Sequence, residues 1–212
     1  MVGRVRELEL LMDRWRQAER GLGQAVLLTG EPGIGKTRLV RELARLLDDN
    51  HSTVLAFQCS EARSASALHP IADHFRRALN ARGDSLEALL GAAGVAVTDA
   101  APVVAELLGA APASGEEPDA LKRHTADIVI AYVLAHAERR PVLVVLEDLH
   151  WADPSTLEFA GELLDAIADS RVLVVATARP GDRFAWPASA HASQLSLGPC
   201  SREEAELLVA QA

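Results

Sequence analysis

The stretch Gly30–Thr37 reads G-E-P-G-I-G-K-T, and the rest of the chain can be organised around it. The pattern G-x-x-x-x-G-K-[ST] predicts a phosphate-binding loop. Its three glycines allow the backbone to turn and to bring its N–H groups close to an anion. Lys36 supplies a point charge for the outer phosphates, and the Thr37 hydroxyl can ligate Mg²⁺. The motif therefore indicates a nucleoside triphosphate, bound with a divalent cation, as the ligand.

The flanking sequence favours this interpretation over a chance glycine-rich turn. An apolar run at Ala25–Thr29 is typical of a buried strand, and the apolar residues that follow Thr37 have helical spacing. Strand, glycine loop and helix is the order that the motif requires. The chain has only two lysines, Lys36 and Lys122, and one of them occupies the loop position that requires a compact ammonium group. Arg38 occupies the place where a dinucleotide-binding motif would need its last glycine.

A second apolar run, Val142–Leu146, ends in two acids, Glu147 and Asp148. One carboxylate after such a strand can hold Mg²⁺ through water, and a second can orient or deprotonate the attacking water. If the strand continues through both acids, their side chains point to opposite sides and have different roles. Alone, such a pair is weak evidence and usually belongs to a solvated loop, but the phosphate loop in the same chain favours a functional role. Arg179 follows another apolar run and could contact the terminal phosphate, with a surface arginine as an equal alternative.

Length and composition indicate one globular domain. The chain has 212 residues, of which 49% are hydrophobic, and a formal net charge of −9. The acidic balance argues against direct binding of nucleic acid or an anionic membrane. The two cysteines, Cys59 and Cys200, make neither a disulfide framework nor a metal cluster, and we expect both to be buried fillers. The N-terminus is charged and no apolar run is long enough to span a membrane, so we expect a cytoplasmic protein.

Strand-like and helix-like segments alternate, which predicts an α/β fold with a largely parallel sheet and helices on both faces. Residues 91–119 are rich in Gly, Ala, Pro and Ser, and we expect only one short helix there, at 103–108. We interpret residues 60–118 as an insertion of loops and short helices. Ligands of such sheets bind beyond the carboxyl ends of the strands, so the phosphate loop, the acid pair and Arg179 should share one edge. The expected strands are 25–29, 52–59, 142–146, 172–176 and 194–197.

Four motifs together resemble one known family. They are V-G-R-x-R-E-L at 2–8, the loop at 30–37, V-L-V-V-L-E-D-L-H-W-A-D-P-S-T at 142–156, and V-A-T-A-R-P at 175–180. The combination is similar to the AAA-type ATPase domain of signal-transduction ATPases with numerous domains (STAND). Such domains occur in large LuxR-type transcriptional regulators and beside some adenylate cyclase or kinase domains. The resemblance implies a three-layer P-loop NTPase fold of the ASCE/AAA type, with a five-stranded sheet in the order 2-3-4-1-5.

The resemblance also implies domain bounds and residue roles. Residues 1–198 would form the ATPase domain, and 199–212 the first helix of a truncated lid. Asp148 matches the catalytic acid, Glu147 the Mg²⁺-directing position, and Arg179 the sensor position, with Lys36 acting on the phosphates. Thr37 and Glu147 would hold Mg²⁺, partly through water. The residues expected to bind ATP are Val2, Gly3, Arg4, Gly30, Glu31, Pro32, Gly33, Ile34, Gly35, Lys36, Thr37, Arg38 and Pro199.

The expected function is Mg²⁺-dependent ATP binding and slow hydrolysis in a nucleotide-operated switch that signals to output domains or partner proteins outside this chain. Glu147 stands where the family usually has Asp. Its longer side chain affects the geometry of metal binding and hence the expected rate of ATP hydrolysis. The alternatives are a non-hydrolysing nucleotide-binding or interaction module and a DNA-loading ATPase. The acidic balance argues against the second.

Three smaller expectations follow from the same resemblance and the neighbouring residues. His150 and Trp151 should pack on each other in a structural role. Nucleotide-dependent self-association would fit the function, with Arg171 reaching across a subunit boundary. Because the chain stops at Ala212, where such proteins normally continue, we expect a fragment or a truncated gene product.

Overall fold

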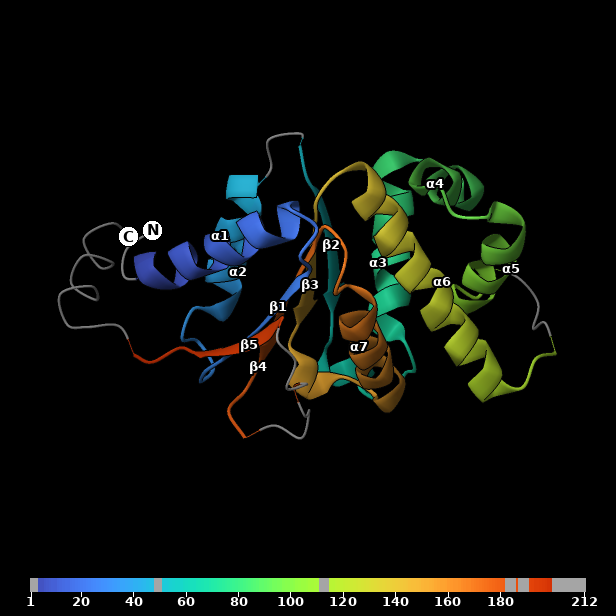
Figure 1. Cartoon of the computed structure of the whole chain (residues 1–212). Helices are drawn as coiled ribbons and strands as arrows, with labels where there is room; N and C mark the ends of the chain where they lie inside the picture. Colours follow the sequence, from blue (N-terminus) through green and yellow to red (C-terminus); the bar gives the residue numbers. More distant parts are fainter. Residues whose placement is uncertain (1–3, 48–50, 111–114, 182–185, 187–190, 200–212) are drawn as a thin grey trace.

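The computed structural model describes residues 4–47, 51–110, 115–181, 186 and 191–199. At its centre is a parallel five-stranded sheet in the order β2-β3-β4-β1-β5 (Figure 1). The strands are β1 (Gln24–Thr29), β2 (Thr53–Gln58), β3 (Val142–Glu147), β4 (Val172–Ala178) and β5 (Ala192–Ser196). The described helices are α1 (Val5–Glu19), α2 (Lys36–Leu47), α3 (His69–Arg82), α4 (Leu86–Ala93), α5 (Val97–Leu107), α6 (Pro118–Arg139) and α7 (Pro154–Ala166), with short 3-10 turns η1 (Glu61–Arg63) and η2 (Leu149–Trp151).

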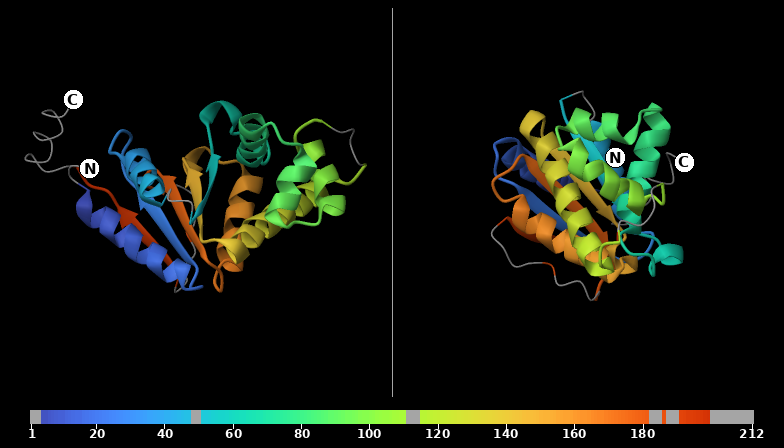
Figure 2. Two further views of the ribbon diagram at one scale, coloured as in Figure 1. Left: turned by 90° about the horizontal axis from the view of Figure 1, so that it is seen from above. Right: turned by 90° about the vertical axis from the view of Figure 1, so that its right-hand side faces the viewer.

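Two helical layers cover the sheet, which confirms the predicted α/β class and strand order. Successive side chains of a strand point to opposite faces, so each strand contributes to two cores. On one face, α1 and α2 pack over residues such as Val26 and Leu143. On the other, α3, α6 and α7 cover residues such as Leu27 and Val144. Figure 2 shows α4 and α5, in green, beyond α6 on this second side. Burial on both faces explains the continuous apolar runs.

The register of the strands aligns their carboxyl ends. Thr29 in β1 lies beside Ala178 in β4, and Leu146 in β3 lies beside Ala176 in β4. The phosphate loop, the acid pair and the segment that follows β4 therefore leave the sheet at the same edge. This is the edge that the sequence pattern predicts for a ligand.

The secondary structure of residues 91–119 differs from the sequence-based expectation. α4 is one of the short helices expected within 60–118, although no position was predicted for it, and α5 begins six residues before the predicted short helix. Pro102 lies inside α5, where it lacks one backbone N–H but does not end the helix. The composition of α5, with a proline and several β-branched residues, is unfavourable for a helix, yet Val104 is fully buried in the core that α6 shares. Tertiary burial therefore outweighs weak local helix propensity here.

Several expectations concern residues outside the described ranges. Val2, Gly3, Cys200 and the lid helix are among them, and only Pro199 of the lid segment is described, as an exposed residue after β5. In the part of the chain that the structure describes, none of the helices combines the length and apolar character that crossing a membrane requires.

Candidate functional site

The phosphate loop connects β1 directly to α2, as the motif predicts. Gly33 and Gly35 have φ angles of 77° and 104°, which side-chain-bearing residues rarely adopt. A Cβ atom on Gly30 would lie 2.8 Å from the Cγ2 atom of Ile34, so this position also has no room for a side chain. The loop is therefore shaped by its glycines, and the N-terminus of α2 opens toward the space beside it.

Lys36 is the first residue of α2, and its side chain is buried against the loop. Its Nζ atom donates to the carbonyl oxygen of Gly30 at 2.7 Å and to that of Glu31 at 3.2 Å. Burial lowers the pKa of the Lys36 ammonium and the nearby Arg179 lowers it further, whereas Asp148 acts in the opposite direction. The ammonium is thus held at the loop by two backbone carbonyl oxygens, and Asp148 and Arg179 are close enough to affect its pKa.

Glu147 ends β3 with a half-buried carboxylate. Burial raises the pKa of this carboxyl, and Asp148 adds to the effect, while a hydrogen bond from the Thr37 hydroxyl lowers it. The Oε1 atom of Glu147 is buried and has no hydrogen-bond partner among the described residues. A buried carboxylate oxygen without a partner is costly, and a cation beside Thr37 would satisfy it.

Asp148 leaves the strand instead of continuing it. Its φ of 58° and ψ of 46° are left-handed, and it precedes the turn η2. The alternation argument for the two acids therefore does not apply, because the chain turns at Asp148. The backbone N–H of Asp148 donates to the Oγ1 atom of Thr177 at 2.9 Å. Thr177 is completely buried near the end of β4, and sequence analysis did not single it out, although it is a polar residue in an apolar run.

A cavity of about 330 Å³ lies at this edge of the sheet. Asp148 contributes from the end of β3, and Arg179 from the end of β4. The expected His150–Trp151 packing is present, with 5.1 Å between ring centroids, but Trp151 also lines the cavity. The Nδ1 atom of His150 lies 4.0 Å from the Oδ1 atom of Asp148. The lining residues are Pro32, Gly33, Gly35, Lys36, Thr37, Arg38, Asp148, His150, Trp151 and Arg179.

Arg4 connects three separate segments on the other side of the loop. Its buried guanidinium donates to the carbonyl oxygens of Ile34 at 3.1 Å and Gly198 at 2.6 Å, and pairs with Glu7 at 2.8 Å. Gly198 immediately precedes Pro199. The start of α1, the phosphate loop and the end of β5, all predicted to approach the nucleotide, are thus adjacent. That they contact the base remains a prediction.

Arg171 contacts the end of α6 within this chain, and its reach across a subunit boundary stays a prediction. Its guanidinium donates to the carbonyl oxygens of Ala137, at 2.8 Å, and Glu138 at the end of α6. It precedes β4, so it lies at the edge of the sheet opposite the phosphate loop. In this arrangement Arg171 closes the last turn of a helix within its own chain.

The residues at the site fit a Mg²⁺–nucleotide complex. In nucleotide sites Mg²⁺ usually keeps several waters and takes only one or two protein ligands, together with phosphate oxygens. Correspondingly, the described residues contain no group of three His, Cys, Asp or Glu side chains that could hold a metal ion. Thr37 and the unpartnered oxygen of Glu147 would supply the protein ligands, beside the loop amides and Lys36.

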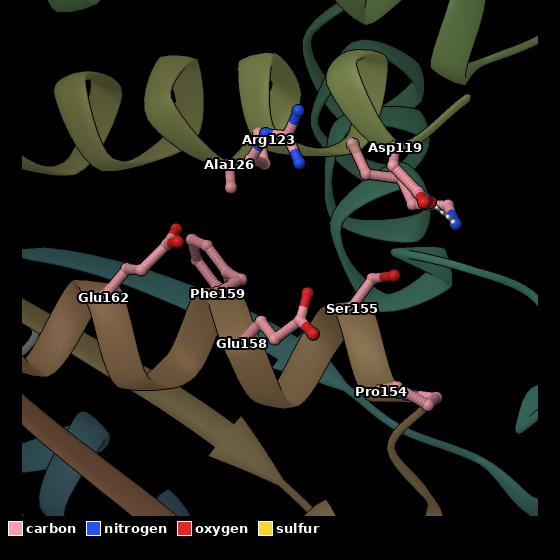
Figure 3. Close-up of a pocket in the computed structure, with 9 residues that line it drawn as sticks. Asp119, Arg123, Ala126, Pro154, Ser155, Glu158, Phe159 and Glu162 are labelled. Carbon is pink, nitrogen blue, oxygen red and sulfur yellow. Dashed lines mark hydrogen bonds and ion pairs between the residues drawn. The ribbon is translucent and has the colours of Figure 1, made fainter. Parts of the chain in front are cut away.

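A separate hollow of about 500 Å³ lies between α6 and α7 (Figure 3). Glu158 and Glu162 of α7 extend toward it from one side, and Arg123 lies on the α6 side. Lys122, the second lysine of the chain, pairs with Asp119 at 2.8 Å on its rim. None of the residues of the phosphate loop lines this hollow.

Comparisons with known proteins identify the family of this chain. A family model described as the AAA ATPase domain matches residues 1–175. Uncharacterized protein R02095 of Rhizobium meliloti (strain 1021) is 31% identical over 219 residues, which cover 99% of this chain and 21% of that protein. The chain thus spans about a fifth of the length of this curated relative.

Solved structures resemble the chain in fold. A chain of the Drosophila ORC structure bound to DNA has a TM-score of 0.51 and 16% identity, with 100% of this chain and 46% of that one covered. Caenorhabditis elegans PCH-2 has a TM-score of 0.48 and 16% identity, with 97% and 45% covered. At this identity the Drosophila structure supports the fold alone. The family match, by contrast, includes the phosphate loop and both acids, and the chain belongs to the AAA ATPase domain family.

Proposed function

We propose that this domain binds ATP with Mg²⁺ and hydrolyses it slowly, as a nucleotide-operated switch in a signalling or transcriptional regulator. The observation that carries the proposal is the shared position of the site residues. The phosphate loop, Lys36, Asp148 and Arg179 line one cavity, and the unpartnered oxygen of Glu147 lies near Thr37. Family membership supports nucleotide binding in general.

Each residue has a role that its surroundings support. The loop amides and Lys36 bind the phosphates. When nucleotide binds, the Lys36 ammonium donates its hydrogen bonds to phosphate oxygens instead of to the loop carbonyl oxygens. Thr37 and Glu147 hold Mg²⁺, which neutralises charge on the phosphates. Asp148 lies at the cavity, where it orients the attacking water. Arg179 contacts the terminal phosphate.

A switch requires contacts that exist in only one nucleotide state. Arg179 would supply such a contact, because only the triphosphate carries the group it meets. We propose that the bound state is passed to output domains or partner proteins. The matching region makes up 21% of the relative in Rhizobium meliloti. This supports the proposal that the domain works as one part of a larger protein. The net charge of −9 supports a role without direct nucleic-acid binding by this segment.

Two variants test the proposal, each with a matched control. Lys36→Ala should abolish ATP binding in calorimetry, whereas Lys122→Ala, which changes the only other lysine, should leave it intact. Asp148→Asn should retain ATP binding and lose phosphate release, whereas Asp127→Asn on the exposed side of α6 should change neither. Undiminished ATP affinity in Lys36→Ala would contradict the assignment of this loop as the ATP phosphate site.

The hydrolytic part has a separate test. Single-turnover phosphate release from wild-type protein should be slow and should depend on Mg²⁺. Binding without any release, with or without Mg²⁺, would establish a non-hydrolysing nucleotide-binding module instead. Glu147→Asp then distinguishes the cause: a gain of turnover in this variant would show that the longer side chain limits the metal geometry.

A further inference from the structure

Arg179 rests on an aromatic ring at the mouth of the phosphate cavity. Its Cζ atom lies over the Trp151 indole, 5.2 Å from the ring centroid. The side chain is exposed, and among the described residues the structure gives it neither a hydrogen-bond acceptor nor a carboxylate. A long arginine side chain loses considerable rotamer entropy when it is fixed, so without a partner it would sample many positions. Trp151 is the group that fixes it.

Trp151 is itself held by its backbone and by its side chain. The backbone N–H of Trp151 donates to the Asp148 carbonyl oxygen at 2.9 Å, which closes the turn η2. The His150 ring packs against the indole, with ring centroids 5.1 Å apart, and Trp151 is half-buried against the main core. Trp151 and Arg179 follow β3 and β4, which are neighbouring strands. Trp151 is therefore fixed in position, and its backbone is hydrogen-bonded to Asp148, the proposed catalytic acid.

Stacking leaves the guanidinium able to bind an anion. A guanidinium contacts a ring with its face, whereas its N–H groups donate in its plane. Arg179 is close enough to Lys36 to lower the pKa of the ammonium, and both side chains line the same cavity. Two cations directed at one space repel each other until an anion lies between them. The terminal phosphate of a triphosphate is the group that fits between them.

We propose that Trp151 is a positioning residue that holds Arg179 at the place where the terminal phosphate of ATP binds. The inference rests on the proposed function and deepens it: Trp151 makes the site selective for a triphosphate over a diphosphate. Its effect passes through Arg179, so removing the ring should matter only for ligands that carry the terminal phosphate.

The test measures the affinities of ADP and of the non-hydrolysable β,γ-imido analogue of ATP, both with Mg²⁺, by calorimetry. Trp151→Leu should weaken binding of the analogue roughly two- to tenfold and leave ADP binding unchanged. Trp151→Phe, which keeps an aromatic face, should lose less. In an Arg179→Ala background, Trp151→Leu should have no further effect on either ligand, because the group that it positions is gone.

The outcomes separate this inference from the proposed function. Equal losses for ADP and the analogue, or an undiminished loss in the Arg179→Ala background, would overturn the positioning role of Trp151. The proposal that the wild-type domain binds ATP would still stand. Failure of the wild-type protein to bind either ligand would overturn the proposed function together with the inference. Because Trp151 packs against the core, each variant's thermal melting is recorded, and Trp151→Phe carries the test if Trp151→Leu does not fold.

Discussion

The hydroxyl of Thr177 accepts a hydrogen bond from the backbone N–H of Asp148 at 2.9 Å. The ladder between β3 and β4 ends with the pair Leu146 and Ala176, just before these residues. A side chain therefore takes the place of a backbone acceptor at the point where β3 turns away from β4. This contact anchors the left-handed backbone of Asp148, which L side chains seldom adopt.

Replacing Thr177 should affect hydrolysis more than binding. Thr177→Val keeps the shape but removes the acceptor, so the Asp148 N–H would lose its partner in a part-buried site. We expect the free energy of unfolding to fall by about 1–3 kcal/mol and phosphate release to slow, with ADP affinity unchanged. Urea unfolding and single-turnover assays measure the two effects.

The conservative variant Thr177→Ser provides the control, because it retains a hydroxyl at the same position. It should recover most of the turnover and of the unfolding free energy. If Thr177→Val hydrolyses ATP at the wild-type rate, the hydrogen bond does not position the catalytic acid.

The phosphate loop, the acid pair and the strands themselves could be predicted because each depends on a local pattern, whereas the strand order followed from the family resemblance. Continuous apolar runs define the strands, and the glycine motif defines the loop. The Thr177–Asp148 and Trp151–Arg179 contacts join residues at the ends of β3 and β4 or just after them, so they depend on the register of these two strands. In the expected order 2-3-4-1-5, β3 and β4 are neighbours. A threonine near the end of β4 and a tryptophan just after β3 are therefore signals from which contacts between these two strand ends could be predicted.

Other parts could not be predicted from local signals. α5 contains Pro102 and several β-branched residues, and its burial in the core that α6 shares shows why it is helical. The turn at Asp148 was missed for a related reason. Two acids after an apolar run give no sign of where pairing stops, and a non-glycine residue with a positive φ has no composition signal.

Arg4 should stabilise both the fold and the phosphate loop. Its guanidinium is buried and bonds the carbonyl oxygens of Ile34 and Gly198. Arg4→Leu removes these contacts and leaves two acceptors without a partner, so we expect a loss of about 2–4 kcal/mol in unfolding free energy. Nucleotide affinity should fall as well, because the loop loses an anchor at Ile34. Arg16→Leu, at an exposed surface pair on α1, should have little effect on either quantity. Wild-type stability of Arg4→Leu in urea would contradict the anchoring role.

His74 should make the protein sensitive to mild acid. The ring is buried among Phe57, Phe75 and Tyr132, and its Nδ1–H donates to the Ala56 carbonyl oxygen at 3.1 Å. Burial lowers the pKa of His74 from 6.5 to about 4. The unfolded state therefore binds a proton between these values and the folded state does not, so stability is complete above pH 6.5 and falls toward pH 4. The loss should reach roughly 3 kcal/mol.

Urea unfolding between pH 7 and pH 4 measures this effect. His74→Phe should flatten the profile, because the ring that titrates on unfolding is removed. His124→Gln, at a more exposed position on α6, should keep the wild-type profile. A steep loss of stability in His74→Phe over the same pH range would assign the acid sensitivity to other groups.

Cys59 should be inert until the sheet opens. Its side chain is buried, and its backbone N–H extends the β2–β3 ladder by donating to the Glu147 carbonyl oxygen at 2.9 Å. Burial raises the pKa of the Cys59 thiol to about 12, with contributions from Asp153 and Asp148. The thiolate is the reactive form, so ionisation alone should slow labelling roughly a thousandfold relative to an ordinary thiol.

Labelling by a disulfide reagent at pH 8, in a Cys200→Ser background, checks this expectation. The rate should rise with urea in parallel with global unfolding, because β2, β3 and the site edge open together. A nucleotide that binds only the folded state should slow labelling further, by mass action. Rapid labelling without urea would show instead that the β2–β3 edge opens locally. Because Cys59 pairs with the residue proposed to hold Mg²⁺, such opening would also disturb the metal site.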